Sequence, residues 1–435
     1  MERDEMLDEA AYDRLRLRQW LAGQARGDAV SRRDLLRLSA GLGLAAVPMM
    51  GLAQTAAAAP PAGAGATADA AQAGPIVKPL PPELFTVFGT NAEMRWESMR
   101  DQGHLVPVDR FFVRNHTSTP TLDAGTWRLK LHGSGLRGST TADAPVEFSL
   151  AQLRRLPSTT VTAFVECAGN GRSFFAAQQG QTVSGTAWKL GAVGVARWRG
   201  VRLSAVLRSA GLTDRAVDVM PSGLDPNWVT GGVDLGPVRR PLPIAKALDD
   251  VLLAYEMNGE PLPPDHGFPV RVVVPSWIGI SSIKWVGAIE VSDTPLFSPW
   301  NTQFYRLFGP EYPAEGTLVS RQTLKSAFEL AWQAELPAGR TAVLTGRSWS
   351  GNGRIARVEV STDGGQTWRK ARRVGADTPL AWQRWRLAWR PPAAGSYELL
   401  ARATDLTGAT QPDAVPHNTL GYLFGAVVRH PVTVV

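Results

Sequence analysis

The sequence contains a single cysteine, Cys167, among 435 residues. One thiol cannot form an intramolecular disulfide, so this form of cross-link does not stabilise the chain. A single cysteine also excludes a Cys-x-x-Cys-His motif and therefore a covalently attached haem. A glycine-rich phosphate loop of the familiar spacings is absent as well, so the sequence does not indicate a nucleotide-binding fold.

The sequence also lacks any block of basic residues. The net charge is +7, but the 46 lysines and arginines are spread along the chain, so we expect no nucleic-acid partner. A distributed positive surface can instead steer small anions or an acidic protein partner. With 44% hydrophobic and 20% charged residues, the composition is typical of a soluble globular protein, and the length favours two domains.

The N-terminus has the features of an export signal. Arg32 and Arg33 precede a tract without charge, Leu38–Ala59, which is rich in alanine and glycine. This pattern resembles a bacterial twin-arginine signal over residues 1–59 and predicts a periplasmic or other extracytoplasmic location. A membrane anchor is the alternative, since 22 uncharged residues could just span a bilayer. Alanine and glycine insert poorly, so we expect no stable membrane insertion, and residues 60–77 are predicted to be a flexible linker.

Residues 78–310 mix helix-like and strand-like patterns. The stretch 160–166 is a strand candidate that leads directly into Cys167. Apolar residues at helical spacing predict an amphipathic helix over 201–211, and the apolar run 270–274 predicts a buried strand.

Residues 316–435 show a different pattern. Val358 and Val360 share one strand face, and Asp363 followed by two glycines predicts a hairpin. Apolar and polar residues alternate again over 384–389 and 397–401. Short alternating strands without a helical pattern predict a β-sandwich.

Cys167 has two possible roles on this pattern alone. An isolated free cysteine is often a small buried hydrophobe, whereas a thiolate is a good ligand for a soft metal centre. Arg114, His116, His266 and Lys284 stand beside predicted strands. Each alone is most simply a surface or capping residue, but together such side chains suit a phosphate-bearing ligand.

Several long strings resemble the sulfite oxidase family of molybdenum enzymes over residues 80–435. They are FFVRNH at 111–116, ECAGNGRS at 166–173, GAVGVARWRGVRL at 191–203, VLLAYEMNGEPLPPDHGFPVRVVVP at 251–275 and SSIKWVGAIEVS at 281–292. In addition, VEVSTDGGQTW at 358–368 resembles the immunoglobulin-like dimerisation domain of that family.

The resemblance implies an α+β fold, with a sulfite-oxidase-type molybdopterin domain at 78–310 followed by an immunoglobulin-like β-sandwich dimerisation domain at 316–435. It implies molybdenum and molybdopterin as cofactors, with Cys167 as the protein ligand of the metal. The cofactor-binding residues that it implies are Phe112, Val113, Arg114, Asn115, His116, Asp225, His266, Arg271, Ser282, Ile283 and Lys284.

Two further residues match positions on the reacting side of the metal in this family. Arg172 matches an anion-binding arginine and Tyr305 an active-site tyrosine. The expected reaction is the oxidation of sulfite to sulfate by oxygen-atom transfer. One departure is Leu420, which falls near a second substrate arginine of the family and leaves other sulfur compounds, sulfoxides or nitrate open as substrates.

The resemblance also bears on partners. Without a haem of its own, the chain needs a separate electron acceptor, for which a c-type cytochrome is our hypothesis, and the C-terminal domain implies a homodimer. A hypothesis of a different class is a non-catalytic exported binding protein that uses the β-sandwich, since a fold does not determine function.

Overall fold

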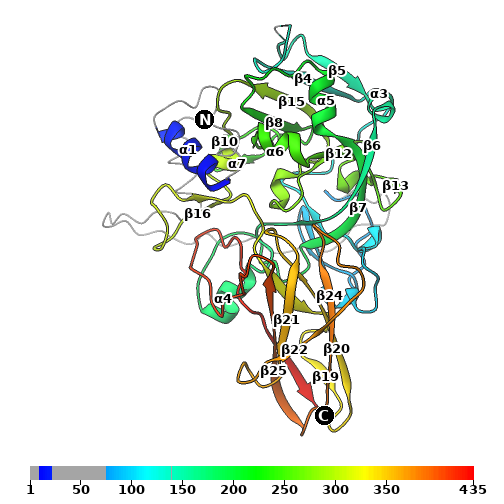
Figure 1. Cartoon of the computed structure of the whole chain (residues 1–435), viewed down its shortest axis with the longest axis vertical. Coiled ribbons are helices and arrows are strands. Elements are labelled where there is room, and N and C mark those ends of the chain that lie inside the picture. The colour runs from blue at the N-terminus through cyan, green and yellow to red at the C-terminus, as the bar shows by residue number, and fades with distance from the viewer. Residues whose placement is uncertain (1–8, 22–74, 139) are drawn as a thin grey trace, which may run out of the picture.

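The structure is a computed structural model that describes residues 9–21, 75–138 and 140–435. It has a mixed helix and strand part built from residues 75–310 and a β-sandwich built mainly from residues 325–434 (Figure 1). Helix α1 (Glu9–Leu21) lies on the outside of the first part.

The first part contains two large sheets. One has the strand order β11 (Leu242–Pro243), β8 (Asp218–Gly223), β15 (Val286–Ser292), β4 (Arg128–His132) and β5 (Val146–Ser149). The other has the order β13 (Glu260–Pro261), β12 (Leu252–Met257), β7 (Val193–Arg202) and β6 (Ser158–Glu166), and β14 (Arg271–Val273) also pairs with β12. An apolar core that includes residues of both sheets, such as Ile289 and Leu253, connects them.

Short elements complete this part. The helices are α3 (Leu150–Arg155), α4 (Ser173–Gln179), α5 (Leu203–Ser209), α6 (Ile244–Asp249) and α7 (Pro299–Thr302). The remaining strands are β1 (Phe85–Phe88), β2 (Asn91–Met94), β3 (Val113–Arg114), β9 (Val229–Thr230), β10 (Val233–Asp234), β16 (Arg306–Leu307) and β17 (Thr317–Leu318).

The predicted helix over 201–211 is wrong at its start. Val201 and Arg202 are the last residues of β7, where they pair with Leu253 and Leu252 of β12. Helix α5 begins only at Leu203. The ladder hydrogen bonds of β7 therefore take precedence over the helical spacing of the apolar side chains.

The predicted β-sandwich is confirmed. One sheet has the order β18 (Lys325–Phe328), β20 (Ala342–Trp349), β24 (Gln383–Trp389) and β23 (Arg372–Val374). The other has the order β19 (Ala334–Leu336), β26 (Arg429–Val434), β25 (Gly395–Asp405), β21 (Ile355–Ser361) and β22 (Arg369–Lys370). The predicted hairpin joins β21 to β22, and the Asp363 carboxylate accepts the backbone N–H of Thr367 at 2.9 Å in its turn.

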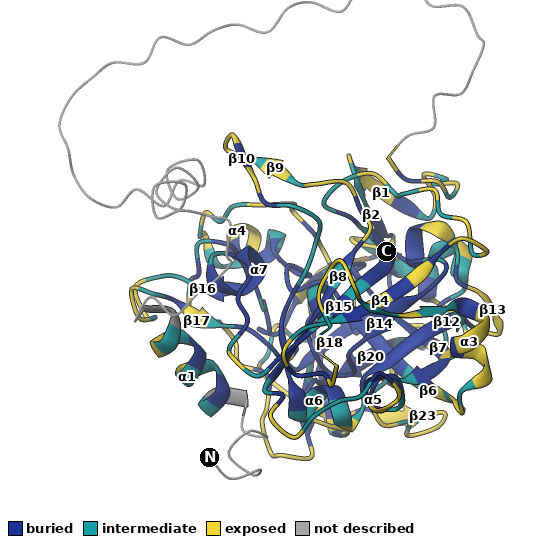
Figure 2. Cartoon of the chain, turned by 90° about the horizontal axis from the view of Figure 1, so that it is seen from above, coloured by how far each residue is buried: buried dark blue, intermediate teal, exposed yellow. Residues whose placement is uncertain are grey.

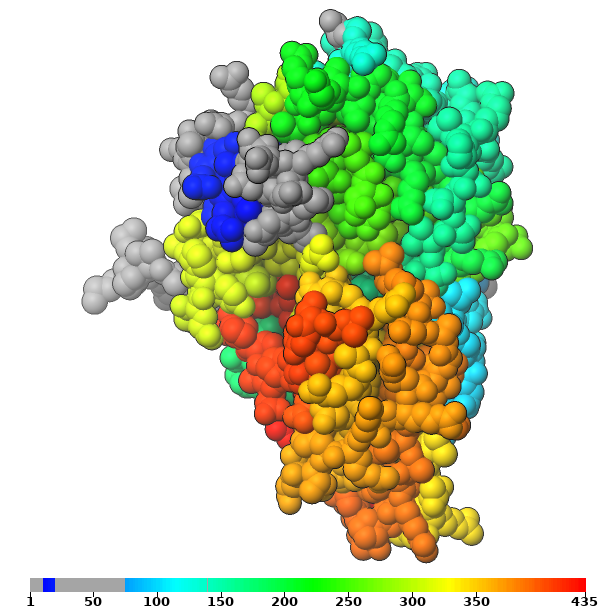
Figure 3. Space-filling view, in the orientation of Figure 1, coloured from blue at the N-terminus to red at the C-terminus, as the bar shows by residue number. Residues whose placement is uncertain are grey.

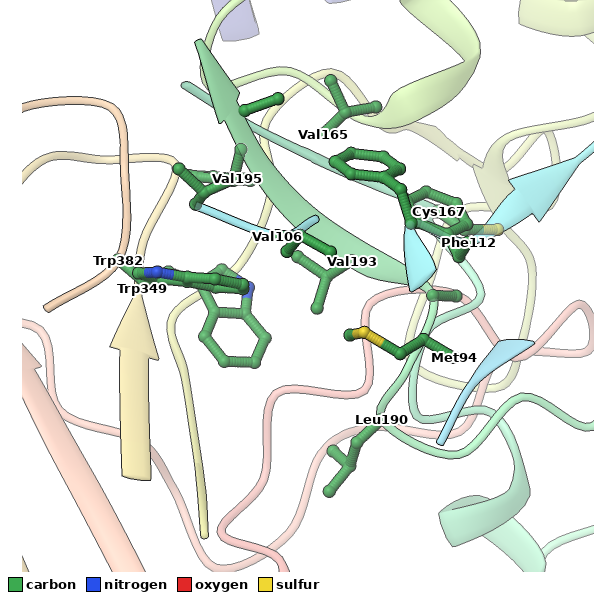
Figure 4. Packing of buried hydrophobic residues seen from close by; sticks show 14 of the residues in the cluster. Met94, Val106, Phe112, Val165, Cys167, Leu190, Val193, Val195, Trp349 and Trp382 are labelled. Atoms are coloured by element: carbon green, nitrogen blue, oxygen red, sulfur yellow. The ribbon is translucent and has the colours of Figure 1, made fainter. Parts of the chain in front are cut away.

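The two parts share buried surface. Trp349 and Trp382 of the sandwich belong to the same apolar cluster as Val193 and Cys167 of the first part (Figure 4). The segment 411–428, between β25 and β26, returns to the first part, and its red atoms lie between the two parts in Figure 3. By its position in the sequence this segment belongs to the predicted C-terminal domain, but it lies partly against the first part.

Helix α1 packs against the first part, which the sequence analysis did not anticipate (Figure 2). The buried Asp218 carboxylate accepts hydrogen bonds from the Tyr12 hydroxyl at 2.9 Å and from Arg16 Nη2 at 3.0 Å. The twin arginines Arg32 and Arg33, and most of the predicted signal and linker, lie outside the described residues. Within the described ranges, no helix has the length and apolarity required to cross a bilayer.

Candidate functional site

Cys167 lies directly after the last residue of β6, and its backbone is held firmly. Its N–H donates to the Ala192 carbonyl at 2.9 Å, which extends the ladder between β6 and β7. The chain then turns, and Gly171 adopts a φ of 89°, a conformation that favours glycine. The N–H of Gly169 donates to Cys167 Sγ at 3.4 Å, so the turn also holds the sulfur directly.

A cavity opens beside Cys167 and collects most of the predicted cofactor-binding residues. Its walls include Phe112, Arg114, Asn115, His116, Cys167, Asp225, His266, Arg271, Ser282, Ile283, Lys284 and Tyr305. These residues come from segments separated by up to about two hundred positions in sequence. The fold therefore brings the thiol, five basic side chains and a phenol to one place.

Two predicted residues are not among the walls of this cavity. Val113 lies between Phe112 and Arg114 in extended backbone, so its side chain points the other way and packs with Phe85 and Ala92. A side-chain contact of Val113 with the cofactor does not fit this geometry. Arg172 makes its contacts with Leu420, Thr186 and Tyr422 instead.

Part of the cavity wall is strongly basic. Lys284 donates to the side chain of Asn115 and to the Asp265 carbonyl, and Arg271 donates to the carbonyls of His266 and Ser282. Burial lowers the pKa of Lys284 well below its usual value, helped by repulsion from Arg271. Burial also lowers the pKa of Arg271 to about 9.

The two histidines of the cavity are neutral for the same reason. Burial, followed by repulsion from nearby cations, lowers the pKa of both His266 and His116 well below the usual value. Trp300 Nε1 donates to His116 Nε2 at 3.1 Å and thus fixes the orientation of that ring. His266 Nε2 is buried and has no hydrogen-bond partner among the described residues.

Arg114 and Tyr305 lie close to the thiol. Burial disfavours the charge of Arg114, but interactions with Tyr305 and Cys167, including a hydrogen bond to Cys167, raise its pKa overall. Burial raises the pKa of Tyr305, so the phenol keeps its proton near neutral pH. Tyr305 can therefore donate a hydrogen bond and Arg114 carries a permanent positive charge beside the sulfur.

Arg172 occupies a tightly packed position. Its Nε donates to the Leu420 carbonyl at 2.9 Å and its Nη1 to the Thr186 carbonyl at 2.9 Å. The guanidinium carbon lies 5.3 Å from the ring centre of Tyr422, which in turn stacks on Tyr305 at 5.1 Å. Leu420 thus contributes its backbone to the orientation of Arg172.

The sequence analysis missed two residues of this region. Tyr422 stands two positions after Leu420, and only its place in the fold puts it beside Tyr305 and Arg172. Asp265 was visible next to His266, and its carboxylate accepts the N–H groups of Val77 and Lys78. Asp265 therefore attaches the segment at residues 77–78 to the cavity wall.

These residues can hold an anionic cofactor with a soft metal. The basic side chains exceed the two carboxylates of the cavity, and the Asp265 carboxylate already accepts backbone N–H groups, so the wall formed by Lys284 and Arg271 suits a phosphate. His266 Nε2, which has no partner among the described residues, is available for a hydrogen bond with a ligand. The thiol of Cys167 in the same wall suits a molybdenum–sulfur centre.

The comparisons with known proteins agree with this class of site. Residues 116–300 match the model of an oxidoreductase molybdopterin binding domain, and residues 329–434 match a molybdenum-cofactor oxidoreductase dimerisation domain. The fold and the site thus define a molybdopterin-dependent oxidoreductase.

Proteins of similar sequence indicate which family of this class the chain belongs to. Chicken sulfite oxidase (Gallus gallus) is 38% identical over 346 residues, which cover 75% of this chain and 72% of that protein. Mouse mitochondrial sulfite oxidase (Mus musculus) is 35% identical over 376 residues, 82% of this chain. The chain belongs to the sulfite oxidase family, and its match spans 63% of the length of the mouse enzyme.

Two further similarities lie outside the sulfite oxidases proper. The crystal structure of the sulfane dehydrogenase SoxCD from Paracoccus pantotrophus superposes with a TM-score of 0.67 at 29% identity, covering 78% of this chain and 83% of that one. The NADH nitrate reductase of Ulva prolifera is 32% identical over 79% of this chain and 42% of that protein. Family membership implies the molybdenum cofactor, whereas the substrate varies among these proteins.

Proposed function

We propose that this protein oxidises sulfite to sulfate. The observation that carries the proposal is the pair of Arg114 and Tyr305 beside the thiol of Cys167, because a sulfur oxoanion requires positive charge and hydrogen-bond donors. Arg172 lies against Tyr422, which stacks on Tyr305, and adds a further positive charge to this region. The similarity to chicken sulfite oxidase supports the same substrate.

The chain positions the reactants. Cys167 would bind the metal, while Arg271, Lys284 and His266 would hold the phosphate end of the cofactor. When bound, molybdopterin with its molybdenum supplies oxygen-atom transfer and accepts two electrons. Arg114 and Arg172 attract the anion, and the Tyr305 hydroxyl donates a hydrogen bond where negative charge gathers. The net reaction converts sulfite and water into sulfate, two protons and two electrons.

The electrons pass in this proposal to a separate acceptor, for which we favour a c-type cytochrome. The support is that a chain with one cysteine has no covalently attached haem. Rapid mixing of the sulfite-reduced enzyme with cytochrome c should reduce the haem faster than dioxygen reoxidises the enzyme. A faster reaction with dioxygen alone would contradict this acceptor.

Export and pairing complete the proposal. Arg32 and Arg33 before an uncharged tract support export by the twin-arginine route to the periplasm. Cell fractionation of an Arg32→Lys/Arg33→Lys variant should find the protein retained in the cytoplasm. The match of residues 329–434 to a dimerisation domain supports a homodimer, which light scattering at micromolar concentration should detect as twice the chain mass.

A second candidate substrate is a sulfane sulfur compound. Leu420 contributes no charge beside Arg172, and the sulfane dehydrogenase shares the fold. Steady-state assays with sulfite, polysulfide, and nitrate plus a reduced viologen dye distinguish the candidates. Molybdenum analysis of the same sample should find about one metal per chain, whereas a binding protein without catalysis would contain none.

A further inference from the structure

The residue before Cys167 is a fully buried carboxylate with several partners. Glu166 has no exposed surface. Its Oε1 accepts from Lys325 Nζ at 2.7 Å and from Asn170 Nδ2 at 2.9 Å. Its Oε2 accepts from Trp349 Nε1 at 2.8 Å. Both carboxylate oxygens of the residue that precedes Cys167 are therefore engaged.

These partners come largely from the other part of the molecule. Lys325 and Trp349 are paired residues on the neighbouring strands β18 and β20 of the sandwich. Lys325 Nζ also donates to the Asn170 carbonyl at 2.7 Å, and Gln322 Nε2 donates to the Glu166 carbonyl at 2.7 Å. The sandwich and the segment that leads into it thus bind the Cys167 loop, residues 166–172, at its main chain and its side chains.

The opposite side of the same loop is held by the segment 411–428. The N–H of Leu423 donates to the Ala168 carbonyl at 2.8 Å. A Cβ at Gly171 would lie 3.1 Å from the Cβ of Phe424, so the two backbones are in close contact. The Cys167 loop is therefore enclosed by residues that follow the catalytic domain in sequence, and Figure 4 shows Cys167 and Trp349 within one cluster.

We propose that Lys325 is a positioning residue for Cys167. The β-sandwich, which matches a dimerisation domain, is then also a structural part of the molybdenum site. A buried ion pair adds little net stability, because desolvation offsets its attraction. What it provides is a fixed geometry, since loss of one partner leaves an uncompensated buried charge. The proposal concerns the thiol loop and holds for any substrate of the enzyme.

The variant Lys325→Met has a matched control in the same domain, Arg347→Met. Arg347 forms a buried ion pair with Glu329 and donates to the carbonyls of Met99 and Gln102 in the first part. It therefore also links the two parts through a buried cation, but at residues 99–102 instead of the Cys167 loop. Lys325→Met and Arg347→Met remove the same charge and comparable interdomain hydrogen bonds.

Thiol labelling of the cofactor-free protein tests the proposal, because Cys167 is the only thiol in the chain. We expect Lys325→Met to raise the native-state rate of labelling by iodoacetamide at least about tenfold, which corresponds to about 1.4 kcal/mol of lost local order. Arg347→Met should change this rate less than about twofold. In cofactor-loaded samples, Lys325→Met should lower molybdenum per chain and kcat while leaving KM unchanged.

Conservative variants separate positioning from general destabilisation. Lys325→Arg should restore slow labelling, since its guanidinium can reach the same acceptors. Gln322→Met removes the donor to the Glu166 carbonyl without leaving a buried charge, and it should raise the labelling rate even if Lys325→Met does not fold. Labelling at the wild-type rate in every variant that folds would overturn the proposal. An increase in Arg347→Met as large as that in Lys325→Met would overturn it as well. If wild type and variants alike fail to oxidise sulfite, the proposed substrate is wrong, whereas the labelling rates still test the positioning role of Lys325.

Discussion

Replacement of Arg172 by alanine or lysine tests the anion site most directly. The guanidinium donates to the carbonyls of Leu420 and Thr186 through Nε and Nη1, and its face lies over Tyr422. Nη2 forms no hydrogen bond with the described residues and remains the donor that an anion can use. Lysine cannot reproduce this arrangement, because its single ammonium lacks the planar fork that the two carbonyls and the anion require together.

The expected magnitude follows from that one donor. A hydrogen bond to a charged group contributes about 1.5–3 kcal/mol, and each 1.4 kcal/mol changes a rate or affinity tenfold. Arg172→Ala should therefore lower kcat/KM for sulfite about tenfold to a hundredfold. Arg172→Lys should retain charge but lose the orientation imposed by Leu420 and Thr186, so we expect a loss of about the same size.

Steady-state kinetics with an artificial one-electron acceptor provides the assay, with molybdenum content measured on the same samples. Because Arg172 does not line the cofactor cavity, the metal content should stay at the wild-type value. Wild-type kcat/KM in Arg172→Ala would refute the anion role and leave Arg172 as a packing residue between Gly169, Gly185 and Gly421. A wild-type enzyme that does not oxidise sulfite would instead refute the proposed substrate.

Three other expectations follow from the structure. Cys167→Ser should abolish turnover with the fold retained, since a hydroxyl is a harder and far less acidic ligand; full activity with normal metal content would contradict the ligand assignment. Burial lowers the pKa of His430 to about 4, so the unfolded chain binds a proton that the folded chain excludes, and stability should fall by about 3 kcal/mol as pH falls from about 6.5 to 4. Urea unfolding at both ends of this window should show a smaller pH dependence in His430→Phe. Asp218→Asn leaves Arg16 without its buried carboxylate, so trypsin should cleave the full chain within helix α1 at least about tenfold faster than wild type; equal cleavage would show that the helix does not depend on Asp218.

Much of the candidate site could be predicted because its residues lie in continuous strings that one strand or turn presents together. Strand β6 and the following turn place Cys167, and the segment 112–116 presents all of its side chains except that of Val113 to the cavity. In such strings local backbone geometry determines which side chains share a face. The same rule explains why the side chain of Val113 packs away from the cavity, since alternate residues in extended backbone face opposite ways.

The contacts between the two parts could not be predicted, because they join residues far apart in sequence. Nothing near Lys325 in the sequence indicates that it pairs with Glu166, and Tyr422 meets Tyr305 only after segment 411–428 returns from the sandwich. The contact of Arg16 with Asp218 joins residues 202 positions apart. Long-range pairs of this kind depend on the whole topology rather than on local pattern.

The position of Leu420 illustrates how such contacts alter the interpretation of a substitution. In the sequence, Leu420 stands near a substrate arginine of related enzymes and suggests a loss of positive charge. In the structure, its carbonyl holds Nε of Arg172, a contact that any residue could provide through its backbone. The side chain of Leu420 is itself buried, in a cluster with Tyr305 and Tyr422. The substitution therefore leaves Arg172 anchored by a backbone carbonyl near two phenols, without a second arginine at position 420.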